Sequence, residues 1–362
     1  MIGTGPASLL HVFPSFRVGG AQMRFAAVAN RFGARYRHLI VSLDGADSAR
    51  ERLAPDLDIA FPTLPGGGLA AIRWALRALR PDVLITHNWG SMDWAIANLP
   101  SLARHIHIED GFGPEERDRQ FRRRVLTRRL VLRRSTVVLP SRTLLGIAAD
   151  TWRLPAHRLR YIPNGIDLAR FAAPAASASR AEPVIGTVAA LRPEKALDRL
   201  LRAFHAVTAS LPARLVIAGD GPERPRLEHL AATLGVAPRV QFTGHIADPA
   251  PLYAGFDVFA LSSDTEQMPL SVIEAMAAGL AVAGTDVGDV RRMLAAENRR
   301  FVGPRDGNAL ADSLRALLAA PALRARLGAA NRDKATRDYD QEAMFAAYAA
   351  LFDCVENRAR TE

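Results

Sequence analysis

Residues 257–286, "DVFALSSDTEQMPLSVIEAMAAGLAVAGTD", place a polar loop and a helical stretch between two short apolar runs. The runs at 257–263 and 281–286 predict buried strands, because each is short, apolar and ended by polar residues or glycine. Residues 269–278 predict a helix. Strands joined through a helix run parallel to each other. This stretch therefore predicts a parallel sheet with a helix on its face.

The same alternation of strand and helix fills the rest of the chain. Further strands are predicted at 9–16, 37–45, 82–90, 105–111, 135–141, 184–191, 213–221 and 240–246. Further helices are predicted at 21–33, 69–80, 117–133, 196–210, 223–235, 308–319 and from about 340 to 357. The fold class is therefore α/β, with Rossmann-like, doubly wound parallel sheets.

A stretch rich in Ala, Pro and Ser divides the chain into two halves. With 362 residues, the chain is long enough for two domains. We predict a first domain at 1–170, a linker at 171–183 and a second domain at 184–339. The helix at about 340–362 is expected to pack back on the first domain. Ligands bind at the carboxyl ends of such strands, so we expect the site in a cleft between two facing domains.

Composition narrows the class of protein. The single cysteine, Cys354, excludes an intrachain disulfide and any Cys-rich zinc site. The N-terminus lacks the order of a signal sequence, and no run of 18 apolar residues occurs. We expect a cytoplasmic protein whose membrane contact, if it has one, is peripheral and on the inner face of the cell membrane.

The net charge of +10 comes from arginine, and nine arginines fall between Arg117 and Arg134. Apolar residues are interleaved with them at near-helical spacing, which predicts a basic amphipathic helix. Such a helix either presents a solvated charged face or lies on an anionic membrane surface. We expect no nucleic-acid partner, because aromatic interleaving and nucleic-acid modules are absent from the sequence.

Two junctions between a predicted strand and helix carry residues suited to phosphate. Gly19 and Gly20 let backbone amides approach an anion, although a glycine pair also serves any tight turn. Arg192 and Lys195 follow the strand at 184–191 and place two cations beside a helix start. They either neutralise a diphosphate or are ordinary surface charges.

The stretch of residues 262–279 carries two glutamates. Pro269 suits the first helical position, so Leu270 and Ser271 would offer amides to an anion such as a diphosphate. Glu274, in the first turns of the helix, can accept hydrogen bonds from sugar hydroxyls, and Glu266 can point into the cleft. Alternatively, Ser271 and Glu274 form a capping box.

These features occur together with several others in a recognisable order. Glu266, seven intervening residues and Glu274 in "EAMAAG" resemble the E-x7-E motif of the retaining family 4 glycosyltransferases, which have the GT-B fold. The segments "VGGAQ", "IPNGID", "GTVAALRPEK", "VIAGDGPERPRLE" and "VQFTGHIAD" resemble the other landmarks of that family. The resemblance extends from Leu9 to about Leu351.

The resemblance implies that the first domain lies on the acceptor side and that the second is the nucleotide-sugar donor domain. It also implies a role for each matching residue. Gly20, Lys195 and the amides around Leu270 and Ser271 would hold the phosphates of a nucleoside-diphosphate-sugar. Glu274 would bind the ribose and Glu266 the transferred sugar. Further residues expected to line the cleft by position are His107, Asn164, Gly219, His245 and Ile246. No cofactor and no metal are implied, since cationic side chains and a helix dipole would replace a divalent ion.

Three positions depart from the family pattern. Ala190 stands where the family usually has arginine, and Arg192 could substitute if the strand extends that far. Asp110 stands where many members have a histidine near the transferred sugar, so it is a candidate catalytic residue. Ala281 replaces a common proline.

The leading functional prediction is a hexosyltransferase-type enzyme that moves a sugar to a cell-envelope glycan or lipid-linked acceptor. One alternative is a GT-B-fold nucleotide-sugar epimerase or hydrolase. Another is a noncatalytic glycosyltransferase-like subunit. A dinucleotide-dependent oxidoreductase is disfavoured, because no G-x-G-x-x-G follows a strand with an acidic residue about 20 positions later.

Overall fold

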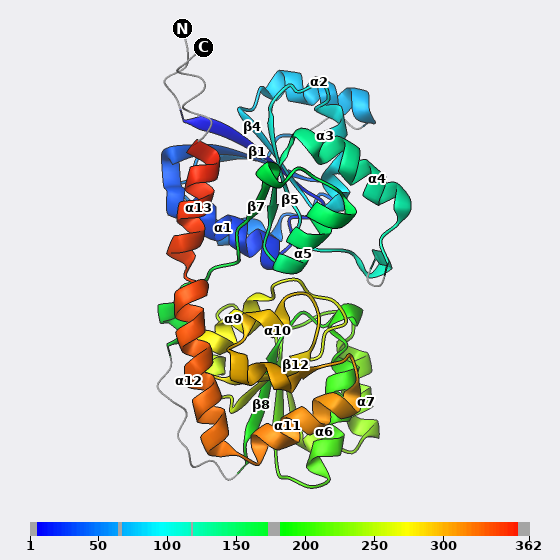
Figure 1. Cartoon of the computed structure of the whole chain (residues 1–362), viewed down its shortest axis with the longest axis vertical. Helices are drawn as coiled ribbons and strands as arrows, with labels where there is room; N and C mark the ends of the chain where they lie inside the picture. Colours follow the sequence, from blue (N-terminus) through cyan, green and yellow to red (C-terminus); the bar gives the residue numbers. More distant parts are fainter. Residues whose placement is uncertain (1–5, 64–66, 117–118, 173–181, 354–362) are drawn as a thin grey trace. The chain divides into compact units, whose positions relative to one another are not determined.

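The computed structural model describes residues 6–63, 67–116, 119–172 and 182–353, in two compact units (Figure 1). The first unit combines Met1–Pro163 with Glu342–Glu362, and the second is Asn164–Gln341. Residues 173–181 of the predicted linker, residues 117–118 and Cys354 lie outside the described residues. The chain enters the second unit before the linker, because Ile166 bridges to Asp340 and Phe171 is buried in that unit's core.

The sheet of the first unit is parallel, in the order β3-β2-β1-β4-β5-β6-β7. Its strands are β1 (Ala7–Phe13), β2 (Tyr36–Ser42), β3 (Ile59–Ala60), β4 (Val83–His87), β5 (Arg104–Ile108), β6 (Thr136–Leu139) and β7 (Leu159–Tyr161). The order reverses between β1 and β4, as in other doubly wound sheets.

Helices cover both faces of this sheet. They are α1 (Gly20–Phe32), α2 (Leu69–Leu79), α3 (Met92–Ala97), α4 (Arg122–Val131), α5 (Arg142–Gly146) and α13 (Gln341–Asp353). Alternation along β1 sorts them, because Leu9 faces a core shared with α1 and α13, whereas Leu10 faces a core shared with α2 and α3. Figure 1 shows α13 beside α1, and Phe32 and Phe345 pack edge to face between them.

The second unit repeats the design with the order β10-β9-β8-β11-β12-β13, again parallel. Its strands are β8 (Val184–Val188), β9 (Arg214–Ala218), β10 (Val240–Gly244), β11 (Val258–Leu261), β12 (Ala281–Thr285) and β13 (Val302–Gly303). The strand pair predicted from residues 257–286 is formed, since β11 and β12 are parallel neighbours.

Helices again lie on two faces of the sheet. They are α6 (Leu197–Thr208), α7 (Arg224–Thr233), α8 (Ala250–Tyr253), α9 (Leu270–Ala277), α10 (Val290–Met293), α11 (Gly307–Leu318) and α12 (Pro321–Asp338). Along β11, Val258 and Ala260 face the core of α6, α7 and α11, and Phe259 and Leu261 face the core of α9. The loop that carries Glu266 follows directly after Leu261, the last residue of β11.

Candidate functional site

Glu266 lies in the loop that joins β11 to α9, and its side chain is 11% exposed. The Lys195 ammonium donates to Glu266 Oε1 at 2.5 Å, and Ser263 Oγ donates to the same oxygen at 2.8 Å. Lys195 belongs to the short turn Pro193–Lys195 after β8, and its side chain is 23% exposed. The structure thus brings together two residues that lie 71 positions apart, at the carboxyl ends of neighbouring strands.

A hydrogen-bonded frame holds this loop in place. Arg199, in the first turn of α6, donates to the Ser262 carbonyl at 2.6 Å and to Asp264 Oδ1 at 2.7 Å. The Asp264 amide donates to the Glu194 carbonyl at 2.8 Å, and Ser262 Oγ donates to the Lys195 carbonyl at 2.9 Å. The loops of Lys195 and Glu266 are therefore bonded to each other through their backbones, which pre-organises the pair. No sequence motif pointed to Arg199.

Gly288 lets a third loop close over the same place. It follows β12 with φ at +54°, and a Cβ at this position would overlap the Glu266 carbonyl oxygen. The neighbouring Asp289 amide donates to the Gln267 carbonyl at 2.9 Å. A side chain at position 288 would therefore push the glutamate loop away from β12.

Helix α9 begins directly after the glutamate loop. Pro269 is its N-cap rather than its first residue, and Leu270 and Ser271 are the first two helical positions. Both are half-buried. Since Ser271 lies inside the helix and no side chain caps it, the alternative capping box with Glu274 does not form. The first amides of a helix have no intrahelical acceptor, so they can bind an anion.

Glu274 lies one turn further along α9 and is half-buried. The Tyr253 hydroxyl donates to Glu274 Oε2 at 2.5 Å and to the Ser271 carbonyl at 3.3 Å. Burial raises the pKa of Glu274, and the Tyr253 hydrogen bond acts in the opposite direction. Burial and the neighbouring Glu274 charge raise the pKa of Tyr253 well above its ordinary value, so it remains the donor. No sequence motif pointed to Tyr253 as a partner of Glu274.

The prediction that Arg192 takes the place of the missing arginine at position 190 rested on a longer strand. That premise is wrong, because β8 ends at Val188 and Arg192 is the N-cap of the turn that carries Lys195. Its side chain is exposed. The alternation of a strand therefore does not place Arg192 on the same face as position 190.

The remaining predicted residues of the second unit shape its loops. Gly219, with φ at +134°, follows β9, and a Cβ there would overlap the Ala189 carbonyl oxygen after β8. Asn164 is buried, and its side-chain amide donates to the Met268 carbonyl at 2.8 Å, which fixes the residue before Pro269. His245 and Ile246 directly follow β10, with His245 exposed.

Asp110, which follows β5 in the first unit, is held by a buried arginine. Arg24 of α1 binds both carboxylate oxygens, at 2.5 and 2.8 Å. Burial lowers the pKa of Arg24, but Asp110 and Tyr348 raise it by more, and the net shift is upward. Asn88 Oδ1 also accepts a hydrogen bond from the Asp110 amide at 2.7 Å. Arg24 has no signature in the sequence, because only the fold brings it to Asp110.

His107 does not line a cleft, contrary to the prediction, because its side chain is fully buried. Its Nδ1 is 2.8 Å from Thr86 Oγ1, and its Nε2 is 3.6 Å from the buried Glu109. Arg128 of α4 donates to Glu109 at 3.1 Å and is also fully buried. The prediction of one long basic helix at 117–133 therefore needs correction: α4 is shorter, and Arg128 belongs to the core.

Gly19 and Gly20 lie where predicted, at the start of α1. Gly19 is the N-cap, with extended backbone, and Gly20 is the first helical residue. The helix has 13 residues, so its first amides carry the positive end of a helix dipole. These amides lie in the first unit, whereas Lys195, Glu266 and Glu274 lie in the second.

The described residues contain no group of three His, Cys, Asp or Glu side chains arranged to hold a metal ion. None of the helices within them is long and apolar enough to cross a membrane.

The class of protein follows from comparison with known proteins. Residues 18–170 match the family model described as Glycosyltransferase Family 4, and residues 182–320 match Glycosyl transferases group 1. The fold is that of an Anabaena protein, Alr3699/HepE, crystallised with UDP and glucose, with a TM-score of 0.79 at 18% identity over 96% of this chain and 100% of that one. The two parallel sheets thus form a GT-B fold, as the resemblance implied.

Two relatives of known sequence are also glycosyltransferases. The chain is 34% identical over 155 residues to a lipopolysaccharide core biosynthesis glycosyltransferase, LpsE, of Rhizobium meliloti, covering 41% of this chain and 46% of that protein. It is 34% identical over 197 residues to a GDP-mannose-dependent phosphatidylinositol monomannoside mannosyltransferase of Mycolicibacterium smegmatis, covering 49% and 52%. The matches thus span about half the length of these relatives. The chain belongs to the family 4 glycosyltransferases.

Proposed function

We propose that this protein is a retaining glycosyltransferase that moves a sugar from a nucleoside-diphosphate-sugar to a cell-envelope glycan or lipid-linked acceptor. The observation that carries the proposal is the contact between Lys195 and Glu266, in a loop frame that ends at the first amides of α9. Family membership supplies the reaction class.

The frame suggests how the donor is bound. A diphosphate at the start of α9 would accept hydrogen bonds from the amides of Leu270 and Ser271 and draw the Lys195 ammonium from Glu266. Glu266 would then be free to accept hydrogen bonds from hydroxyls of the sugar. In this proposal the ammonium and the helix dipole stabilise the leaving diphosphate, a task that a divalent ion performs in other enzymes.

Glu274 would bind the two hydroxyls of the ribose. The hydrogen bond from Tyr253 orients its carboxylate through Oε2. For retention, the acceptor oxygen attacks the anomeric carbon on the face from which the diphosphate leaves. The acceptor's proton then passes to the leaving phosphate oxygen, so the products are a glycoside and a protonated nucleoside diphosphate.

Two relatives favour a cell-envelope acceptor. One is a glycosyltransferase of lipopolysaccharide core biosynthesis, and the other is a phosphatidylinositol monomannoside mannosyltransferase. An observation on α4 fits an acceptor in a membrane. Leu126 and Leu130 are 54% and 65% exposed, and the arginines at 122, 123 and 129 are exposed beside them. We propose that this surface of α4 contacts anionic headgroups, with the leucines in the lipid.

The transferase proposal is tested by measuring nucleoside diphosphate release from UDP-, GDP- and ADP-sugars, with and without envelope extracts as acceptor. We expect acceptor-dependent release that persists in EDTA, and a product whose anomeric configuration by NMR matches that of the donor. An inverted product would contradict retention. Absence of binding of any of these donors would contradict both the transferase and the epimerase interpretations.

The membrane proposal needs its own experiment. Vesicles of phosphatidylcholine with about one third phosphatidylglycerol should sediment the protein, and binding should fall as salt rises because surface charges are screened. Leu126→Ser with Leu130→Ser should weaken sedimentation. Leu69→Ser, at an exposed leucine of α2, is the matched control and should leave it unchanged. Equal loss in the control would contradict a specific role for α4.

A further inference from the structure

A cavity lies at the opposite edge of the first sheet from Asp110. Its volume is about 380 Å³, and it is lined by the first residues of β5 and β6, Arg104 and Thr136. Asp110 follows the other end of β5. Because parallel strands all begin at one edge of the sheet and end at the other, this cavity is separate from the strand ends used in the proposed function. Its size suits a small molecule.

The charged part of the lining is entirely cationic. Arg104, Arg134 and Arg158 line the cavity, and it contains no aspartate or glutamate. The side chains of Arg134 and Arg158 make no hydrogen bond or ion pair with any of the described residues, whereas the Arg104 side chain donates to the Leu351 carbonyl at 3.2 Å. Two guanidinium groups are therefore available to an anion, with the fork of donors that matches phosphate oxygens.

His105 adds polarity without charge. Its Nδ1 is 2.7 Å from Ser135 Oγ, and its Nε2 is 2.8 Å from Thr86 Oγ1, so both ring nitrogens are engaged. Burial, assisted by His107, lowers the pKa of His105 to about 3. The ring is neutral near pH 7, and the arginines alone supply the charge of the cavity.

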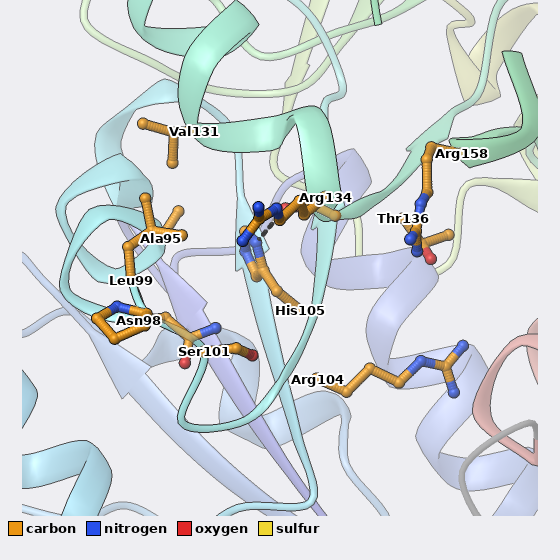
Figure 2. Close-up of a pocket in the computed structure, with 12 residues that line it drawn as sticks. Ala95, Asn98, Leu99, Ser101, Arg104, His105, Val131, Arg134, Thr136 and Arg158 are labelled. Carbon is orange, nitrogen blue, oxygen red and sulfur yellow. Dashed lines mark hydrogen bonds between the residues drawn. The ribbon is translucent and has the colours of Figure 1, made fainter. Parts of the chain in front are cut away.

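The other part of the lining is apolar. Ala95, Leu99 and Val131 lie together at one end of the cavity in Figure 2, Arg158 and Thr136 lie at the other, and the Arg134 side chain lies between them. Hydrogen bonds of the Asn98 side chain hold the loop that carries Leu99. Asn98 donates to the Ala103 carbonyl at 2.9 Å and accepts from the amides of Leu102 and Ala103 at 3.0 Å. A ligand that fits has an anionic head and a short apolar stem.

We propose that this cavity binds a phosphoryl group carried on an apolar stem, with Arg134 and Arg158 on the phosphoryl oxygens and Leu99 and Val131 against the stem. Both a phospholipid headgroup and a free phosphate ester present this chemistry. The site goes beyond the proposed transfer reaction and shares no residue with it.

The test is calorimetric titration of the full chain with inorganic phosphate and with dihexanoyl phosphatidic acid below its micelle concentration, at constant ionic strength. Phosphatidic acid should bind at least about tenfold more tightly than phosphate, because its stem buries apolar surface. Arg134→Gln with Arg158→Gln should weaken both ligands by about tenfold or more. Arg77→Gln with Arg133→Gln removes the same charge from exposed positions outside the cavity and outside the proposed membrane surface of α4, and should change neither.

Each outcome decides part of the proposal. Equal weakening in both double variants would overturn the site and indicate a diffuse effect of charge. Equal affinity for phosphate and phosphatidic acid would overturn the apolar half and leave a free phosphate as the ligand. The single variant Arg134→Gln, at an exposed side chain, guards against misfolding of the double variant. Donor binding should be unchanged in all of them, so this site can fail while the transferase proposal stands.

Discussion

The two units carry comparable ion pairs at the carboxyl ends of their strands, but they hold them differently. In the first unit, Arg24 binds both oxygens of Asp110, and the arginine is 4% exposed. In the second, Lys195 makes one contact with Glu266, and both side chains are partly exposed. The carboxylates are similarly buried, with Asp110 17% and Glu266 11% exposed, so the pairs differ in their cations. Two contacts from a buried guanidinium are costly to open, whereas one contact from a partly exposed ammonium can be exchanged for a ligand. From this comparison we propose that the first pair serves the architecture and the second serves binding.

The largest expected effect is on turnover in the second unit. Glu266→Gln should lower kcat/KM by about 100-fold or more, because the carboxylate would no longer accept hydrogen bonds from the sugar and balance the developing charge. Unfolding by urea should be little changed. Glu297→Gln, at an exposed pair with Arg326, is the control and should retain activity. Normal turnover in Glu266→Gln would remove the functional half of the comparison.

The next effect is on stability in the first unit. Arg24→Gln leaves the Asp110 carboxylate without its bidentate partner, and should lower the free energy of unfolding by about 3 kcal/mol. Arg31→Gln is the matched control, since it lies on the same helix and pairs with Glu342 at the surface. It should cost less than about 0.5 kcal/mol. Urea denaturation measures both, and equal costs would show that burial does not distinguish the pairs.

Acid should separate the units as well. His38 is fully buried on β2, and burial lowers its pKa from 6.5 to about 4. The fold thus favours the neutral ring, so this stability is complete above pH 6.5 and declines as the pH falls toward 4. The loss from His38 should reach about 3 kcal/mol by pH 4.

Two other buried histidines lie beside each other, with His87 Nε2 3.5 Å from His11 Nδ1. Burial also lowers the pKa of each, so both should likewise lose stability as the pH falls. The second unit's three histidines are all exposed. Hydrogen exchange between pH 7 and 4 should therefore show β1, β2 and β4 losing protection before β8 and β11. The reverse order would contradict the assignment. His229→Gln, at an exposed position, should leave the profile unchanged.

Sequence patterns captured what is local in this molecule. Apolar runs located β1, β4, β5, β8, β11 and β12, and the loop from 262 to 269 was recognisable because its glutamates lie close together in the chain. Pairs such as Arg24 with Asp110, 86 positions apart, have no local pattern. Helix α12 was missed because its residues, "PALRARLGAANRDKATRD", lack a clear apolar stripe. Arg128 was assigned to a charged surface because its two buried glutamate partners precede the helix.

The smallest expected effect refines the second unit itself. Tyr253→Phe removes the hydroxyl that donates to Glu274 while keeping the ring, which packs among Phe171, Phe256 and Phe259. Loss of one hydrogen bond to a carboxylate should cost about 1 to 2 kcal/mol, so donor affinity should fall by about tenfold, with kcat nearly unchanged.

Nucleoside diphosphate alone, titrated by calorimetry, should show the same decrease as the whole donor, because Glu274 is proposed to meet the ribose. If the decrease appears only with the sugar attached, Glu274 contacts the sugar instead, and its division of labour with Glu266 must be revised. The result separates two proposed ways of preparing the second unit for its ligand. In one, buried Tyr253 orients the Glu274 carboxylate; in the other, Lys195 exchanges Glu266 for the ligand.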